Sequence, residues 1–196
     1  MKSTSNAIVA IILLSFAAPV AAGPFEDAAA AYGRGDYATS LRLIRPLADQ
    51  GDANAQFNLG VRYDNGEGVP QNNVEALKWY WLAANQGLAN AQYNLGVRYG
   101  EGRGVPQNEA EAVKWYRLAA NQGLADAQYN LGGRYDNGEG VPRNYVNAYM
   151  WFNLAAAQGY QDAEKNRDLV KQRMTPAQII EAQELAREWK SKSTPR

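Results

Sequence analysis

The chain has 196 residues, with 20 Lys and Arg against 20 Asp and Glu, and it contains no Cys and no His. The absence of Cys and His excludes thiolate nucleophiles, imidazole bases, Ser-His-Asp triads, ordinary zinc or copper sites and disulfide bonds. The balanced charge argues against a nucleic-acid partner, because binding to a phosphate backbone needs an excess of Lys and Arg.

Residues 1–22 have the pattern of a secretory signal peptide. Lys2 precedes an apolar run over residues 7–18, and Val20 and Ala22 place small residues at positions −3 and −1 of a cleavage site. We therefore expect cleavage after Ala22 and a mature chain that is periplasmic or secreted, without stable membrane insertion. The apolar run is shorter than the ~20 residues that a membrane helix needs. The alternative is an uncleaved N-terminal anchor.

Three consecutive segments repeat one another with a period of 36 residues, namely 55–90, 91–126 and 127–162. Each segment has the pattern of a helix, a loop and a second helix. A strict period in this range is typical of a solenoid, in which two-helix units stack because one unit cannot bury its own apolar stripe. The sequence therefore predicts an all-α, α/α superhelical solenoid.

The first copy shows how each unit is built. Apolar residues at three- and four-residue spacing predict two amphipathic helices on either side of the glycine-rich segment 64–68. Asn72 suits the N-cap of the second helix, and Gly87 suits the left-handed turn after it. Small Gly60, Ala83 and Ala84 leave room for the rings of Trp79 and Tyr80, which we expect to fill the space between units. The equivalents of Trp79 in the other copies are Trp115 and Trp151.

These repeats closely resemble the Sel1-like repeat, a relative of the tetratricopeptide repeat (TPR). The resemblance is carried by the run Ala55…Leu59-Gly60…Tyr63…Gly66-x-Gly68-Val69…Ala76…Trp79…Ala83-Ala84…Gly87 and by its two copies. It implies a concave protein-binding surface and the role of a non-enzymatic adaptor in the bacterial cell envelope. Family analogy extends this role to the regulation of an envelope protein.

Both ends of the repeat array differ from the repeats. Residues 23–54 read as a shorter, TPR-like capping unit with a tight turn at residues 35–37. Residues 163–196 read as C-terminal capping helices and a tail. Within them, Thr175 and Pro176 predict the start of a helix that runs to about Lys190 and covers the last repeat.

A polar ladder is the main candidate for a binding site. Asn58 and Arg62 lie four residues apart and so share one face of the first helix. The pair recurs as Asn94 and Arg98, and as Asn130 and Arg134. If the first helices line the concave wall, as the resemblance implies, Asn can bond a peptide backbone and Arg can bind a carboxylate. The alternative is that these residues are solvated, with each Arg paired to a nearby acid.

Three further features have two interpretations each. The glycine-rich loops superficially resemble calcium loops, but the copy over residues 100–104 contains Arg103, so we predict turns. The Trp and Tyr pairs suit a glycan-stacking platform, but their helical spacing favours the core. Trp81 is replaced by Arg117 and Asn153 in the other copies, which indicates exposure; it is either an interface anchor or a ring lying on a neighbouring helix.

We therefore expect a non-enzymatic exported scaffold, without cofactor or metal, that binds a protein or peptide. The alternatives are a cell-wall-active hydrolase of β-lactamase-like type and a protein that binds peptidoglycan glycan. No serine is placed beside a lysine by a recognisable motif, and no spacing selects a catalytic pair among the carboxylates.

Overall fold

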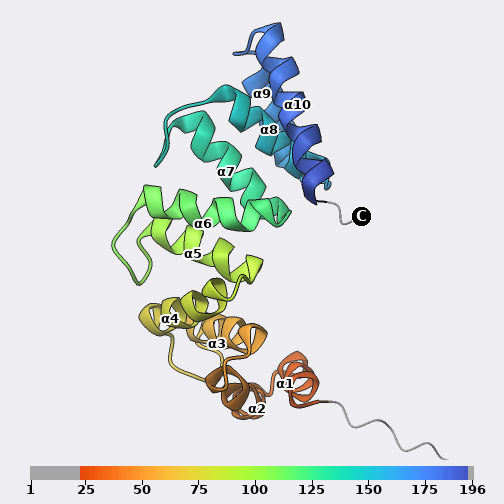
Figure 1. The fold of residues 1–196 in the computed structure, drawn as a ribbon. Coiled ribbons are helices and arrows are strands. Elements are labelled where there is room, and N and C mark those ends of the chain that lie inside the picture. Colours follow the sequence, from red (N-terminus) through yellow and green to blue (C-terminus); the bar gives the residue numbers. More distant parts are fainter. Residues whose placement is uncertain (1–22, 194–196) are drawn as a thin grey trace, which may run out of the picture.

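The computed structural model describes residues 23–193, and within this range all regular secondary structure is helical (Figure 1). The helices are α1 (Pro24–Gly33), α2 (Tyr37–Asp49), α3 (Ala53–Asn65), α4 (Asn73–Asn85), α5 (Ala89–Glu101), α6 (Glu109–Asn121), α7 (Ala125–Asn137), α8 (Tyr145–Ala156), α9 (Gln161–Lys171) and α10 (Pro176–Ser193). The all-α solenoid is confirmed. The predicted signal peptide lies outside the described residues.

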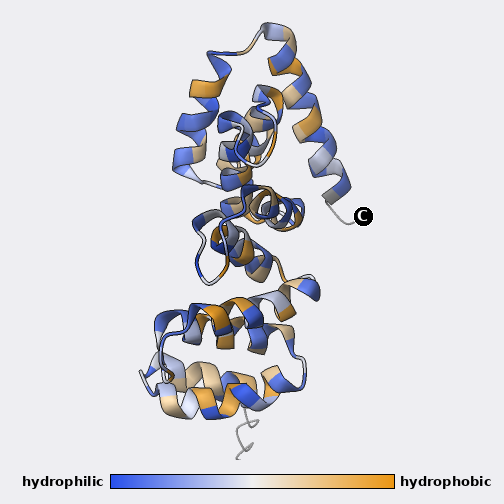
Figure 2. Cartoon of the chain, turned by 90° about the vertical axis from the view of Figure 1, so that its left-hand side faces the viewer, coloured by the Kyte–Doolittle hydropathy of each residue, from blue (hydrophilic) through white to orange (hydrophobic). Residues whose placement is uncertain are grey.

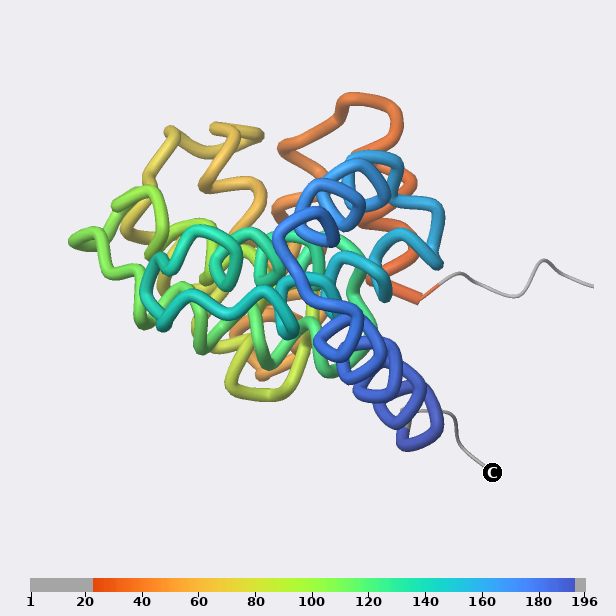
Figure 3. The backbone as a smooth tube through the Cα atoms, turned by 90° about the horizontal axis from the view of Figure 1, so that it is seen from above, coloured from red at the N-terminus to blue at the C-terminus, as the bar shows by residue number. Residues whose placement is uncertain are grey.

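The helices pack in consecutive pairs, and the pairs stack. In each repeat a first helix (α3, α5 or α7) packs against a second helix (α4, α6 or α8), and each second helix then contacts the first helix of the next repeat. The pairs follow one another along the long axis of an elongated molecule (Figure 1). Seen from above, they follow a curved path (Figure 3). Each helix has both hydrophobic and hydrophilic segments, and the loops are mostly hydrophilic (Figure 2).

Side-chain caps and glycines set the helix ends, as the sequence predicts. The Asn72 Oδ1 accepts hydrogen bonds from the backbone N–H groups of Val74 and Glu75 at 3.0 and 3.1 Å, which begins α4. Asn108 and Asn144 cap α6 and α8 in the same way. Gly87, with a φ of 93°, follows the end of α4 in the left-handed region.

The contact between the two helices of each repeat is a glycine against an aromatic ring. A Cβ atom on Gly60 would lie 2.8 Å from the ring of Tyr80, which is 1% exposed. Gly96 faces Tyr116, and Gly132 faces Phe152, in the same way. Trp79 is buried against Ile44 and Ala48 of the preceding helix pair. The expected burial is confirmed for Trp79 and Trp151, whereas Trp115 is half-buried.

Pairs of glutamines, each with one buried and one exposed member, connect each repeat to the one before it. Gln92 Nε2 donates to the backbone carbonyl of Ala84 at 3.2 Å. Gln122 Nε2 donates to Gln92 Oε1 at 2.8 Å and to the carbonyl of Gly87 at 2.9 Å. The same pattern joins Gln56 to Gln86 and Gln128 to Gln158. These bonds satisfy polar groups that would otherwise be buried without partners.

The two ends of the array depart from the repeat. At the N-terminus, α1 and α2 form the short capping pair. At the C-terminus, α9 packs against α8, and α10 crosses α8 rather than pairing with α9 (Figure 1). The cap at Thr175 is confirmed, because its backbone N–H donates to Gln178 Oε1 at 2.9 Å, and α10 runs past Lys190 to Ser193.

Candidate functional site

The polar ladder lies on the first helices, and its members line two depressions. Asn58 and Arg62 border a depression of about 190 Å³ next to Tyr32 of the N-terminal cap. Asn130 and Arg134 border a second depression of about 280 Å³, with mainly polar walls, which extends to α9. We call the side of α3, α5 and α7 that carries the partly exposed Asn58, Asn94 and Asn130 the first-helix face.

The asparagines of the ladder are partly exposed and use their amides locally. Asn58 Nδ2 donates to the carbonyl of Asn54 at 2.8 Å, and Asn130 Nδ2 donates to the carbonyl of Asp126 at 2.9 Å. Because each bond uses the amide N–H, the Oδ1 atom of each side chain remains an acceptor on the first-helix face.

Two arginines of the ladder are buried and hold the stack together, which corrects the expectation that they face a ligand. Arg62 and Arg98 are each 3% exposed. Arg98 forms an ion pair with Asp64 of the preceding repeat and donates to Asn73 Oδ1 at 3.2 Å. Arg62 donates to the hydroxyl of Ser40 in the N-terminal cap. The alternative of pairing with a nearby acid therefore describes Arg98, but as a buried contact between repeats.

Arg134 is the ladder arginine that reaches solvent. Its side chain is 17% exposed and lies between two carboxylates, pairing with Glu109 of the preceding repeat and with Glu139 at 2.7 Å. A partner carboxylate would have to compete with these two acids.

Burial and aromatic rings define the electrostatics of the three arginines. Burial lowers the pKa of Arg62, and it lowers the pKa of Arg98 to about 10, so the guanidinium of Arg98 keeps its charge at neutral pH. Each guanidinium lies over a tyrosine ring at 5.0 to 5.8 Å, in the geometry of a cation–π contact. These contacts fix the arginine side chains within the fold.

The glycine-rich loops act as turns that contact the preceding repeat. Gly68 has a φ of 76°, and a Cβ atom there would lie 2.9 Å from the backbone oxygen of Tyr37. The Asp64 carboxylate binds Arg98 and lies 3.5 Å from Arg103. In residues 23–193 there is no group of three acidic side chains arranged to hold a metal ion. These contacts support the turn interpretation.

Trp81 is exposed, as its variation between copies indicates. It lies on α4, is 50% exposed, and adjoins Val74, which is 62% exposed. Its role as an anchor stays a prediction.

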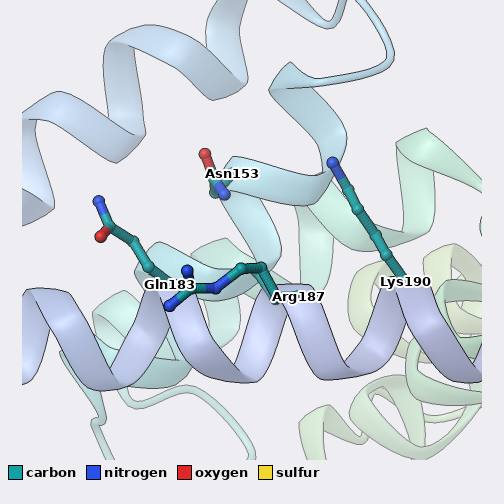
Figure 4. Close-up of a pocket in the computed structure, with 5 residues that line it drawn as sticks. Asn153, Gln183, Arg187 and Lys190 are labelled. Carbon is teal, nitrogen blue, oxygen red and sulfur yellow. The ribbon is translucent and has the colours of Figure 1, made fainter.

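A further depression lies between α8 and α10 (Figure 4). Asn153 approaches it from α8, and Gln183, Arg187 and Lys190 approach it from α10. Its walls are mainly long, exposed side chains, so it does not enclose a ligand. Across residues 23–193, no helix combines the length and apolar character needed to span a membrane.

The residues that complete these contacts were not predicted from the sequence. These residues are the paired glutamines and the acids Asp64 and Glu109, and they make contacts between one repeat and the next. The residue pattern of a single helix does not predict such contacts. The available signal was the identity of Gln at the same two positions in all three copies.

Comparisons with known proteins agree with this architecture. The family model for the Sel1 repeat matches residues 53–88, 89–124 and 125–160. A Sel1 repeat protein from Oxalobacter formigenes is 36% identical, with a TM-score of 0.71 over 74% of this chain and 60% of that one. The protein c5321, a protective antigen of uropathogenic Escherichia coli with an SLR fold, is 44% identical, with a TM-score of 0.69 over 71% of this chain.

The chain matches 60% and 31% of the lengths of these two structures. A comparison with curated proteins gives no match. The three family matches cover more than half of the chain, and they coincide with the three stacked helix pairs. The chain therefore belongs to the Sel1 repeat family.

Proposed function

We propose that the protein is an exported, non-catalytic scaffold that binds a protein or peptide along its first-helix face in the bacterial cell envelope. Sel1 repeats generally mediate protein–protein interaction, and their fold is typically a non-catalytic scaffold. The observation that supports the proposal for this chain is the pair of depressions lined by Asn58 and Asn130 on one side of the stack.

The asparagines are the residues that we expect to contact the partner. Their Oδ1 atoms accept hydrogen bonds from an extended backbone, and their spacing of one repeat suits a peptide that crosses successive first helices. Arg134 adds a cation at one end of the face. Arg62 and Arg98 act indirectly, because they fix the spacing of the repeats.

The position of Ser40 argues against the serine hydrolase alternative. Ser40 is completely buried, and its hydroxyl donates to the carbonyl of Ala28 at 2.5 Å while accepting a hydrogen bond from Arg62. A nucleophile needs access to its substrate and an adjacent base. Incubation with a chromogenic β-lactam and with peptidoglycan tests the remaining hydrolase chemistry, and we expect no turnover.

The scaffold proposal is tested by capture of partners from cross-linked envelopes with the tagged full-length protein. One variant replaces Asn58, Asn94 and Asn130 with Ala. The matched control replaces Asn85 and Asn121 with Ala, because Asn85 makes the same local bond, to the carbonyl of Trp81 at 2.9 Å, at the end of a second helix.

We expect the control to recover the same amount of each partner as the wild type. The triple variant should recover at least tenfold less. Equal recovery with all three proteins would show that the first-helix face is not the binding surface. Sedimentation with insoluble peptidoglycan separates a glycan-binding protein from a protein-binding scaffold.

Export is tested separately. Cell fractionation followed by mass spectrometry of the intact protein should find a mature N-terminus at Gly23 in the periplasm or the medium. Recovery of the uncut chain in the cytoplasm would contradict the export proposal.

A further inference from the structure

Each second helix has a stripe of side chains on its outer face. The residues in this stripe, and what covers them, differ from repeat to repeat. In α4 this outer stripe consists of Val74, Leu77, Lys78, Trp81 and Leu82, which surround one shallow apolar depression. The spacing of three and four residues places these side chains on one face of the helix. All five residues that line the depression belong to α4, and Val74 and Trp81 are 62% and 50% exposed.

In α8 the same register is covered by a helix of the chain itself. The equivalent residues are Val146, Tyr149, Met150, Asn153 and Leu154. Met150 and Leu154 are only 8% and 1% exposed, and they form one apolar cluster with Ala186 and Trp189 of α10. The helix α10 crosses α8 (Figure 1). It shows how this register accepts an amphipathic helix, because its Ala182 and Ala186 are buried there and Leu185 and Trp189 pack beside them.

In α6 the same register is mostly exposed and carries one charged residue more than in α4, namely Arg117 in place of Trp81. The equivalent residues are Ala110, Val113, Lys114, Arg117 and Leu118. Lys114 and Arg117 are exposed. The outer stripes of α4 and α6 differ at three of their five positions, and the change from Arg117 to Trp81 is the largest. The α4 stripe therefore combines the apolar character of α8 with the exposure of α6.

Basic side chains lie on both sides of the α4 stripe. Trp79 packs against α2, and Trp115 packs against α4, so α2 and α6 are the second helices on either side of α4. On the same register, Arg42 of α2 takes the position of Lys78, and Arg117 of α6, which donates to Tyr135 Oη at 3.0 Å, takes the position of Trp81. Among the described residues neither forms an ion pair, whereas Arg45, at the Trp81 position of α2, lies 3.9 Å from Asp49. Lys78, on the stripe itself, lies 3.7 Å from Glu75. A helix docked here gains from acidic residues on its flanks.

We propose that the outer stripe of α4 binds an amphipathic helix of a partner protein, laid across α4 as α10 is laid across α8. The helix presents alanines and large apolar side chains to Trp81 and Val74, and acidic side chains to Arg42 and Arg117. The occupant comes from another protein, because α10 is already seated on α8. The inference rests on the proposed function only in that the chain is a protein-binding scaffold; it uses a different surface.

The test uses the full-length protein and a fluorescein-labelled peptide of residues 175–193, in which Arg187, Lys190 and Lys192 are replaced with Glu. This probe keeps the apolar stripe of α10 and makes its flanks acidic. Fluorescence anisotropy should show saturable binding to one site. Val74→Ala together with Trp81→Arg gives α4 the α6 residues at two of the three differing positions and should weaken binding at least tenfold.

The reciprocal variant, Ala110→Val with Arg117→Trp, gives α6 the α4 residues at the same two positions and should raise the stoichiometry from one peptide to two. Both variants use residues that the fold already accepts at the same register, so circular dichroism and the thermal midpoint should match the wild type. The triple Asn→Ala variant of the first-helix face should bind the probe like the wild type. This last comparison separates failure of the α4 site from failure of the proposed function.

Four results would overturn the inference. The first is that the probe shows no saturable binding, and the second is that the Val74→Ala, Trp81→Arg variant binds it as the wild type does. The third is that the wild-type protein self-associates in sedimentation velocity and this variant does not. The fourth is that the wild-type protein binds anionic lipid vesicles and this variant does not. The third result would assign the stripe to a second copy of the chain, and the fourth would assign it to a membrane surface.

Discussion

Two adjacent glycines of α7 should respond in opposite directions to the same substitution. A Cβ atom on Gly132 would lie 2.8 and 2.9 Å from the Cδ1 and Cε1 atoms of Phe152, whose ring is 1% exposed. A Cβ atom on Gly133 would meet nothing within 4 Å. Both residues are inside the same helix, so the intrinsic helix preference of Ala over Gly is shared and only the packing differs.

The expected magnitudes follow from these two terms. Replacement of an interior helical Gly with Ala stabilises a helix by about 1 kcal/mol. Overpacking of a filled core costs about 1–3 kcal/mol, and the buried ring of Phe152 has little room to move. We therefore expect Gly133→Ala to raise the free energy of unfolding by about 1 kcal/mol. Gly132→Ala should lower it by up to about 2 kcal/mol.

Urea unfolding followed by circular dichroism at 222 nm measures both values. Phe152→Leu serves as a second background, because a smaller side chain opposite Gly132 should reduce the penalty of Gly132→Ala. The reasoning would be refuted if Gly132→Ala were as stable as Gly133→Ala, or if its penalty were unchanged in the Phe152→Leu background.

Other perturbations test the contacts between and within repeats by the same unfolding assay. Gln92→Leu removes the acceptor of Gln122 and leaves the carbonyl of Ala84 with only backbone donors, including the N–H of Gly87, so we expect a loss of about 1–3 kcal/mol. Arg98→Met leaves the largely buried Asp64 without its main ion pair, and a loss of about 3 kcal/mol is expected. Asn72→Ala removes the cap of α4 and should cost about 1 kcal/mol. Burial raises the pKa of Tyr80 to about 12, against about 10 in an unfolded chain, so the folded protein keeps a proton that the unfolded chain loses. Stability should therefore be complete below pH 10 and fall between pH 10 and 12, and Tyr80→Phe should reduce that slope by about 1.4 kcal/mol per pH unit.

The repeat pattern predicts the fold well because each copy reports independently on the same local structure. The caps at Asn72 and the glycine at position 87 follow from short-range backbone preferences, which a sequence displays directly. The start of the first helices is less accurate: α3 begins at Ala53, two residues before the segment that the repeat pattern suggests. A period fixes the length of a unit and leaves its starting point free, and the capping residue Asp52 is replaced by leucine in the next two copies.

The candidate site was harder to predict because it depends on what one repeat places against another. Asn58 and Arg62 share a helix face, as their spacing requires, yet Asn58 is partly exposed and Arg62 is buried. The difference arises from Ser40, a residue of the N-terminal cap that approaches Arg62 only in the stack. Likewise, the sequence indicates that α10 is amphipathic but does not show that it lies on α8 rather than against α9.

The glycine-rich loops have a consequence for how such a chain changes in length. Gly68, Gly104 and Gly140 each press against the start of the helix one repeat earlier, at the backbone of Tyr37, Asn73 and Glu109. Every such junction is made of the same parts, so excision or duplication of one whole 36-residue block would rejoin surfaces that already match. A cut of any other size would put bulky side chains where only a bare backbone fits, and this restricts the array to growing or shrinking in complete modules.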